Sequence, residues 1–253
     1  MTRDKKNFRV AAVIGGTRGL GYQLALRGRK ANLPTVVYGR SVASPPPSDH
    51  FEMRILDLCD LRSVRSANIE LPRPAYVFWV AGAWLKKALV QTDEDDLRAL
   101  TQLLFTGPVL FLRRLLAAAN GPVHLITIAS SSSWKRREYE ALYCGLKAAQ
   151  AAFTRNLVPE LIAADPASKV TLINPGGLAV PDFHTDLEID LGTMMDPGEV
   201  ADIIWRLTRE QHEPFTEVQI LRSQELGQEG VPVISLGSRA PESPQVGARV
   251  HRS

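Results

Sequence analysis

Cysteine is scarce in this 253-residue chain, and neither sign of charge is in large excess. The two cysteines, Cys59 and Cys144, exclude a disulfide-stapled fold and favour a reducing compartment. Thirty basic and 27 acidic residues give a formal net charge of +3, too small to indicate a nucleic-acid partner. The longest apolar run, residues 75–85, is about half the length of a membrane span. The five histidines lack metal-binding spacing. We therefore expect a cytoplasmic protein without a membrane partner, a nucleic-acid partner or a metal.

The composition is typical of a soluble globular domain, with 45% apolar and 23% charged residues. At this length one domain is the leading interpretation, and we expect it to span residues 1–235. Residues 236–253 lack an apolar period and predict a disordered tail. Three consecutive prolines within residues 44–48 predict a loop where a helix would normally connect two parallel strands.

Short apolar, β-branched runs alternate with longer segments of helical periodicity. The runs predict seven strands, at residues 9–14, 35–38, 51–56, 75–80, 123–129, 169–173 and 216–221. The longer segments predict helices at residues 20–31, 60–69, 93–120, 139–163 and 197–209. This order is typical of an α/β protein with a Rossmann-like, three-layer doubly wound fold and a predominantly parallel seven-stranded sheet.

A glycine-rich segment, VAAVIGGTRGLG, joins the first predicted strand to the first predicted helix. Glycines at this point let the backbone turn tightly and approach a pyrophosphate, and the helix N-terminus offers free N–H groups. We interpret the segment as a dinucleotide-binding loop, the alternative being a purely structural turn. Its candidate cofactor-binding residues are Gly15, Thr17, Arg18, Gly19, Leu20 and Gly21.

The end of the second predicted strand indicates which dinucleotide is bound. An NAD site has an Asp or Glu there, whereas this chain has Arg40. The guanidinium of Arg40 suits the 2′-phosphate of NADP, and Arg18 is placed to reach the same group. The alternative for Arg40 is a solvated surface charge. After the third strand, Asp57 and Leu58 are placed to contact the adenine, although Asp57 equally suits a helix N-cap.

Tyr143 and Lys147 lie four residues apart on a predicted helix and therefore share one face. A phenol has a pKa of about 10, and a nearby ammonium lowers it. Tyr143 would then serve as a general acid or base on a carbonyl or an alcohol. Ser130 follows the fifth predicted strand, where ligands bind in open α/β sheets, and is placed to bond the substrate oxygen. The alternatives are a core tyrosine with a surface lysine, and a flexible polar loop for most of residues 130–133.

In spacing and order together, these motifs resemble the short-chain dehydrogenase/reductase family over residues 8–222. The resemblance implies hydride transfer between a nicotinamide and a carbonyl or alcohol, with Ser130, Tyr143 and Lys147 as the catalytic residues. With Arg40, the expected cofactor is NADP(H), to which Tyr143 and Lys147 also bind. The resemblance adds Ala81, Gly82, Pro175 and Gly176 to the cofactor site. It further implies a homodimer or homotetramer built on the long helices.

Four residues depart from the family pattern: Trp79 and Val80 stand in place of an asparagine pair, Leu104 in place of the fourth catalytic residue, and Val180 near a threonine. Pro108 has no N–H for the Leu104 carbonyl, so we expect a kink there and hypothesise that this carbonyl holds the proton-relay water. The alternatives to a reductase are a non-catalytic NADP-binding regulatory or scaffold protein, and epimerase or dehydratase chemistry.

A long loop over residues 178–195 precedes the last large helix and is expected to cover the substrate as a lid. Its apolar residues indicate an apolar or mixed substrate; they are Leu178, Phe183, Leu187, Leu191 and Met194. Cys144, beside Tyr143, points to a different side of the helix and is expected to be a packed, inert thiol.

Overall fold

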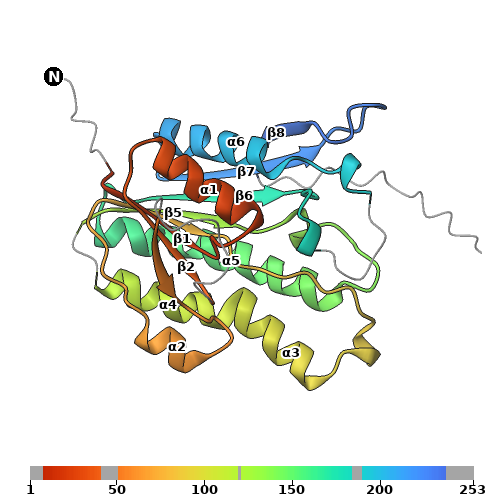
Figure 1. The fold of residues 1–253 in the computed structure, drawn as a ribbon, viewed down its shortest axis with the longest axis horizontal. Coiled ribbons are helices and arrows are strands. Elements are labelled where there is room, and N and C mark those ends of the chain that lie inside the picture. The colour runs from red at the N-terminus through yellow and green to blue at the C-terminus, as the bar shows by residue number, and fades with distance from the viewer. Residues whose placement is uncertain (1–7, 41–50, 119–120, 184–189, 238–253) are drawn as a thin grey trace, which may run out of the picture.

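The computed structural model describes residues 8–40, 51–118, 121–183 and 190–237, which form one eight-stranded sheet flanked by helices (Figure 1). The strands lie in the order β3-β2-β1-β4-β5-β6-β7-β8, and β1 to β7 are parallel. Their bounds are β1 Val10–Ile14, β2 Thr35–Gly39, β3 Glu52–Ile55, β4 Ala75–Trp79, β5 Val123–Ile128, β6 Lys169–Pro175, β7 Phe215–Arg222 and β8 Pro232–Leu236. The helices are α1 Gly19–Lys30, α2 Leu61–Ser66, α3 Glu94–Thr101, α4 Gly107–Ala117, α5 Ala141–Ala164 and α6 Pro197–Glu210.

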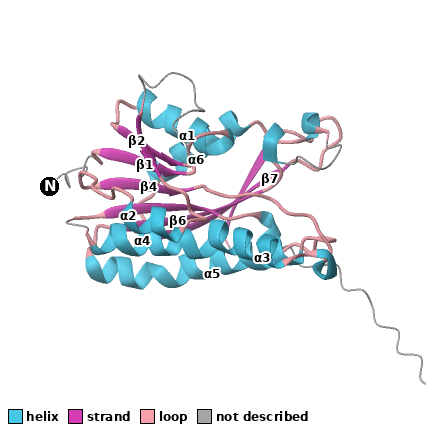
Figure 2. Ribbon diagram, turned by 60° about the horizontal axis from the view of Figure 1, so that its bottom comes forward, coloured by secondary structure: helices cyan, strands magenta, loops and turns pink. Residues whose placement is uncertain are grey.

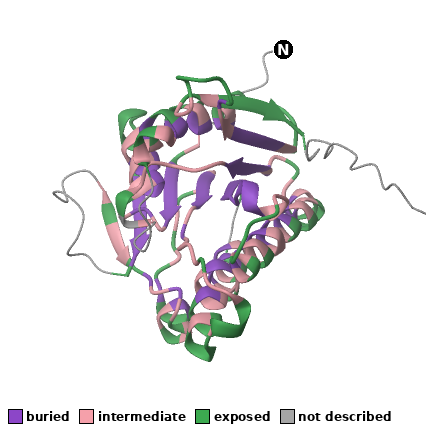
Figure 3. Ribbon diagram, turned by 90° about the vertical axis from the view of Figure 1, so that its right-hand side faces the viewer, coloured by how far each residue is buried: buried purple, intermediate pink, exposed green. Residues whose placement is uncertain are grey.

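Helices cover both faces of the sheet, which confirms the predicted doubly wound fold. Figure 2 shows α1 and α6 on one face and α2, α4 and α5 on the other. Side chains alternate between these faces: along β1, Val10 and Ile14 face the core under α4 and α5, whereas Ala11 and Val13 face α1 and α6. The central strands are therefore buried on both sides (Figure 3), as their uninterrupted apolar runs predict.

The prediction of seven strands is wrong by one, because β8 extends the sheet. It pairs antiparallel with β7, and the Ser223 N–H donates to the Val231 carbonyl at 2.9 Å where the chain reverses. As an edge strand, β8 is mostly exposed and lacks the buried apolar run that marks the other strands. Leu236, expected in the tail, ends this strand. Residues 238–253 and the proline-rich segment at 44–48 lie outside the described residues.

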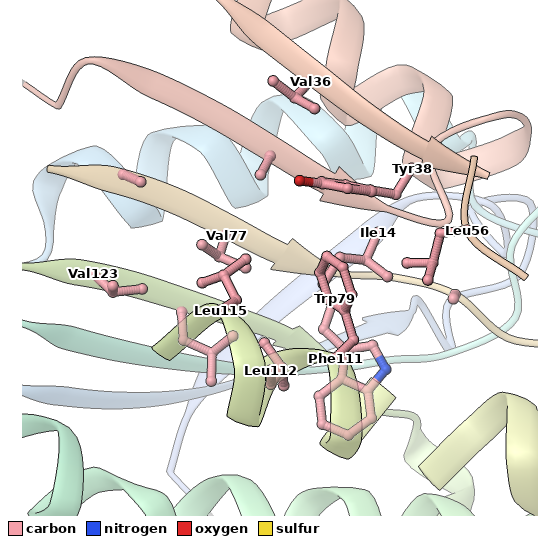
Figure 4. Packing of buried hydrophobic residues seen from close by; sticks show 14 of the residues in the cluster. Ile14, Val36, Tyr38, Leu56, Val77, Trp79, Phe111, Leu112, Leu115 and Val123 are labelled. Atoms are coloured by element: carbon pink, nitrogen blue, oxygen red, sulfur yellow. The ribbon is translucent and has the colours of Figure 1, made fainter. Parts of the chain in front are cut away.

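Trp79 fills the place where the family pattern has an asparagine. It is fully buried at the end of β4, and its ring lies among Ile14, Leu112 and Phe111 in the core (Figure 4). It also meets Phe153 of α5 edge to face, with ring centroids 6.1 Å apart. The indole nitrogen is buried without a hydrogen-bond partner. Aromatic packing therefore braces the strand where the family pattern has polar contacts.

The predicted helix at residues 93–120 changes type midway, at the π-helical segment η3 (Gln102–Thr106) between α3 and α4. The Gly107 N–H donates to the Gln102 carbonyl, five residues back. Pro108 follows directly and lacks the N–H that a regular helix would need. The helix thus departs from regular α geometry just before Pro108, while the kink and the role of the Leu104 carbonyl stay predictions.

Gly107 brings this helix against the chain segment that follows β3. A Cβ atom added at Gly107 would lie 2.2 Å from the Leu58 carbonyl oxygen. Further along, Phe111 and Leu112 of α4 are buried against the sheet. Among the described residues, the helical stretch Glu94–Ala117 is the one that is long and apolar enough to span a membrane, with a mean hydropathy of 1.2. Packing on the sheet accounts for part of that apolar surface.

Candidate functional site

A cavity of about 450 Å³ lies at the C-terminal ends of the parallel strands. It brings together fifteen of the sixteen predicted site residues, which come from segments far apart in the sequence. They are Gly15, Thr17, Arg18, Gly19, Leu20, Gly21, Arg40, Leu58, Ala81, Gly82, Ser130, Tyr143, Lys147, Pro175 and Gly176. Asp57 is the predicted residue that does not line the cavity.

The glycine loop is packed too closely for side chains. Gly15 has a φ of +86°, and an added Cβ would lie 2.5 Å from the Cα of Ala81. A Cβ at Gly21 would lie 2.2 Å from the Gly15 carbonyl oxygen. The backbone between β1 and α1 therefore forms the cavity wall directly, the arrangement that binding of a pyrophosphate requires.

Arg18 and Arg40 line the cavity beside the glycine loop. Leu58 and Cys59 also line it, whereas the Asp57 side chain turns back to accept the Cys59 N–H at 2.9 Å. Burial and the Asp57 carboxylate raise the pKa of the Cys59 thiol, and the Arg40 guanidinium opposes them.

Glu140 is the one acid among the described lining residues, and its charge acts on Tyr143. The contact of Asp57 with adenine stays a prediction.

Ser130 and Tyr143 meet inside the cavity. Ser130 follows β5 in extended backbone and caps the short helix η4 (Ser131–Ser133), where its Oγ accepts the Ser132 N–H at 3.0 Å. Tyr143 lies in the first turns of α5 and is buried. Burial raises the pKa of the phenol well above its usual value, and the Ser130 side chain opposes that rise. Tyr143 is therefore a protonated donor at neutral pH.

Lys147 lies one turn after Tyr143 and is also buried. Its Nζ donates to the Ile128 carbonyl at 3.2 Å and to Oε1 of Gln150 at 3.0 Å. Burial lowers the pKa of Lys147 to about 7. The expected lowering of the Tyr143 pKa by this ammonium is not seen: burial raises the pKa of Tyr143, and Lys147 is not among the groups that shift it.

Leu104, in the place of the family's fourth catalytic residue, is fully buried beside Tyr143 and Leu100. Its Cδ2 lies 3.4 Å from the position a Cβ would take at Gly82, and Lys147 Nζ lies 3.8 Å from the same point. The side of the ammonium toward α3 and η3 is thus apolar. The polar contacts to Lys147 come instead from Gln150 of its own helix and from the Ile128 carbonyl of β5.

The loop after β6 closes the other side of the cavity. Val180 lies against the glycine loop, since a Cβ at Gly19 would be 3.0 Å from its Cγ1. Three of the apolar residues predicted for the lid line the cavity: Leu178, Phe183 and Met194. Leu191 does not line it, and Leu187 lies outside the described residues. The role of this loop as a lid stays a prediction.

Sequence reasoning missed several lining or contacting residues, of which Gln150 is the most informative. It lies three residues after Lys147, in the run KAAQAAF, so helical spacing alone could have placed it on the Lys147 face. Arg137, Glu140 and Arg222 also line the cavity, but they come from loops and strand ends without a recognisable motif. Within the described residues, no group of three or more potential metal-binding side chains occurs.

No protein-family model matches the chain, and no curated protein matches its sequence. In fold it is similar to a short-chain dehydrogenase/reductase from Vibrio parahaemolyticus, with a TM-score of 0.71 and 21% identity over 85% of this chain and 97% of that one. It is similar to serine dehydrogenase from Escherichia coli, with a TM-score of 0.67 and 20% identity over 82% and 96% of the two chains. It is also similar to acetoin dehydrogenase from Enterobacter cloacae, with a TM-score of 0.68 and 18% identity over 85% of this chain and 94% of that one.

Proposed function

We propose that this chain, which has the fold of the short-chain dehydrogenases/reductases, is an NADP(H)-dependent oxidoreductase acting on a carbonyl or alcohol. The observation that carries the proposal is that Ser130 and the buried Tyr143 line the same cavity as the glycine loop. A proton donor and a phosphate-binding backbone then face the same space. Fold by itself does not assign an activity, so the proposal depends on these side chains.

The residues present fit the dinucleotide. The glycine loop offers backbone where a side chain would block a pyrophosphate, as at Gly15 and Gly21. Arg18 and Arg40 line the same end and supply positive charge for a 2′-phosphate, which favours NADP over NAD. Pro175 and Gly176 would hold the nicotinamide end. When bound, the dinucleotide supplies or accepts the hydride.

The chain's own residues handle the proton. Because burial raises its pKa, Tyr143 holds its proton at neutral pH and donates it to the substrate oxygen during reduction. The Ser130 hydroxyl bonds the same oxygen as negative charge develops on it. Lys147 would contact the cofactor ribose through the N–H that the protein leaves unused. In the alcohol direction the same groups act in reverse, with Tyr143 accepting the proton.

The test is Tyr143→Phe, assayed by NADPH oxidation with a panel of ketones, aldehydes and quinones. We expect turnover to fall by about 10²- to 10⁴-fold, the usual contribution of a general acid. NADPH affinity, measured by fluorescence titration, should stay within a few-fold because the phenyl ring keeps the packing. Tyr139→Phe is the matched control, since Tyr139 is 61% exposed and does not line the cavity. Equal turnover in Tyr143→Phe and wild type would contradict the role of Tyr143.

The apolar Leu104 favours a second candidate function, a non-catalytic NADP-binding regulatory or scaffold protein. Such a protein would bind NADPH and oxidise it with none of the carbonyl compounds. Under either function, we infer a cytoplasmic homodimer or homotetramer built on α3, α4 and α5, the long helices of one face. Light scattering on the purified chain tests the assembly.

A further inference from the structure

Gln150 is an amide buried where an apolar side chain would be less costly. It lies three residues beyond Lys147 on α5, is fully buried, and has alanines at the two positions on either side. Its Oε1 accepts the Lys147 Nζ–H at 3.0 Å. Its Nε2 is buried without a hydrogen-bond partner. An unpaired buried amide group destabilises a fold, so the residue calls for a functional explanation.

The orientation of this amide follows from the chemistry of its neighbour. An ammonium can only donate, so the atom of Gln150 that faces Lys147 must be the oxygen. Thr154 Oγ1 lies 2.9 Å from the Gln150 backbone carbonyl and 3.1 Å from Thr127 Oγ1, which ties this turn of α5 to β5. The amide oxygen is therefore held toward Lys147 from a fixed part of the helix.

We propose that Gln150 is a positioning residue for Lys147. Together with the Ile128 carbonyl, it accepts two of the three N–H donors of the ammonium and leaves the third for the cavity that Lys147 lines. The consequence for turnover rests on the proposed function, whereas the effect on Lys147 itself does not.

Among the side chains around Lys147, Gln150 is the one that accepts a hydrogen bond from its ammonium. The helix face opposite presents Leu104, the segment after β4 presents Gly82, and β5 presents the Ile128 carbonyl. Tyr143, one turn earlier on α5, is neutral at physiological pH, and the charges of Glu140 and Arg137 act on Tyr143. No charged group among the described residues contributes to the lowered pKa of Lys147. The uncharged amide oxygen of Gln150 thus stabilises the Lys147 ammonium by a hydrogen bond and not by an ion pair.

The experiment measures the pKa of Lys147 directly, by NMR titration of the full chain with carbon-13-labelled lysine, using Lys147→Met to assign the signal. Gln150→Met removes the acceptor and keeps the length of the side chain, so the pKa should fall by about one unit. Gln150→Glu places a carboxylate at the same atom, so the pKa should rise by about one unit or more. Leu161→Met, a volume-conserving change at a buried position further along the same helix, should leave the pKa unchanged.

Turnover provides the second measurement. The pH profile of kcat for NADPH oxidation should move in the same direction as the pKa in each Gln150 variant and stay in place in Leu161→Met. If the pKa moves but no carbonyl compound is reduced by the wild type, the inference about Gln150 holds and the proposed function fails. If the wild type turns over and the pKa of Lys147 is the same in both Gln150 variants, the inference is overturned and the proposed function stands.

Discussion

The two ends of the cavity are built from different parts of the chain. At the glycine-loop end, backbone atoms form the wall, and Gly15 and Gly21 approach neighbouring backbone more closely than any side chain allows. At the other end, buried side chains form the site, and Tyr143 and Lys147 have pKa values displaced mainly by burial. Close backbone contacts determine which residues fit at the first end, whereas burial determines the protonation of the side chains at the second. The two ends should therefore respond to substitution in different ways.

At the backbone end, a single methyl group should have a large effect. In Gly21→Ala the new Cβ would lie 2.2 Å from the Gly15 carbonyl oxygen, so the loop must shift. We expect NADPH binding to be lost and the free energy of unfolding to fall by about 1–3 kcal/mol. Calorimetric titration and urea denaturation measure the two effects.

Gly145→Ala is the control for that substitution. Gly145 lies within α5, and an added Cβ would meet nothing within 4 Å. Alanine favours a helix over glycine by about 1 kcal/mol, so this variant should be slightly more stable and bind NADPH normally. Equal NADPH affinity in Gly21→Ala and wild type would show that the loop does not hold the dinucleotide.

The charge at the same end should set the choice of dinucleotide. Arg40→Ser removes the guanidinium proposed to hold the 2′-phosphate, so NADPH affinity should fall about 10- to 100-fold while NADH affinity changes little. Arg29→Ser removes the same charge from an exposed position of α1 outside the cavity and should change neither affinity. A parallel loss of NADPH and NADH binding in Arg40→Ser would place Arg40 away from the 2′ position.

At the side-chain end, the lowered pKa of Lys147 should make the free energy of unfolding depend on pH. The folded pKa of Lys147 is about 7 and its ordinary value is 10.5. Between these values the unfolded chain binds a proton that the folded chain does not, so this group makes stability rise with pH. The slope is at most about 1.4 kcal/mol per pH unit. Lys147→Met should remove that rise, as measured by urea unfolding across the window.

Buried His124 offers a check on the same reasoning at lower pH. Burial lowers its pKa from 6.5 to about 3, so its contribution is lost as pH falls below 6.5. The two windows do not overlap. Identical slopes above pH 7 in the wild type and Lys147→Met would mean that Lys147 titrates normally in the folded protein.

The same contrast explains how far the sequence could be interpreted. The glycine spacing predicted the loop at Gly15–Gly21 because no other residue fits the backbone there. Tyr143 and Lys147 were placed on one face by helical periodicity, but the direction of the Tyr143 pKa depends on burial, which spacing does not reveal. Asp57 was ambiguous because the same carboxylate suits a local turn. β8 escaped prediction because an exposed edge strand carries little apolar signal.

Gly107 has a consequence that reaches beyond its own helix. Its lack of a side chain lets η3 and α4 rest on the carbonyl of Leu58, and Leu58 lines the glycine-loop end of the cavity. The same helical stretch carries Leu104 against Tyr143 at the reacting end. Any larger residue at Gly107 must push the helix away from the Leu58 carbonyl. The absence of a side chain at Gly107 therefore helps to set how far apart Leu58 and Tyr143 lie in the cavity.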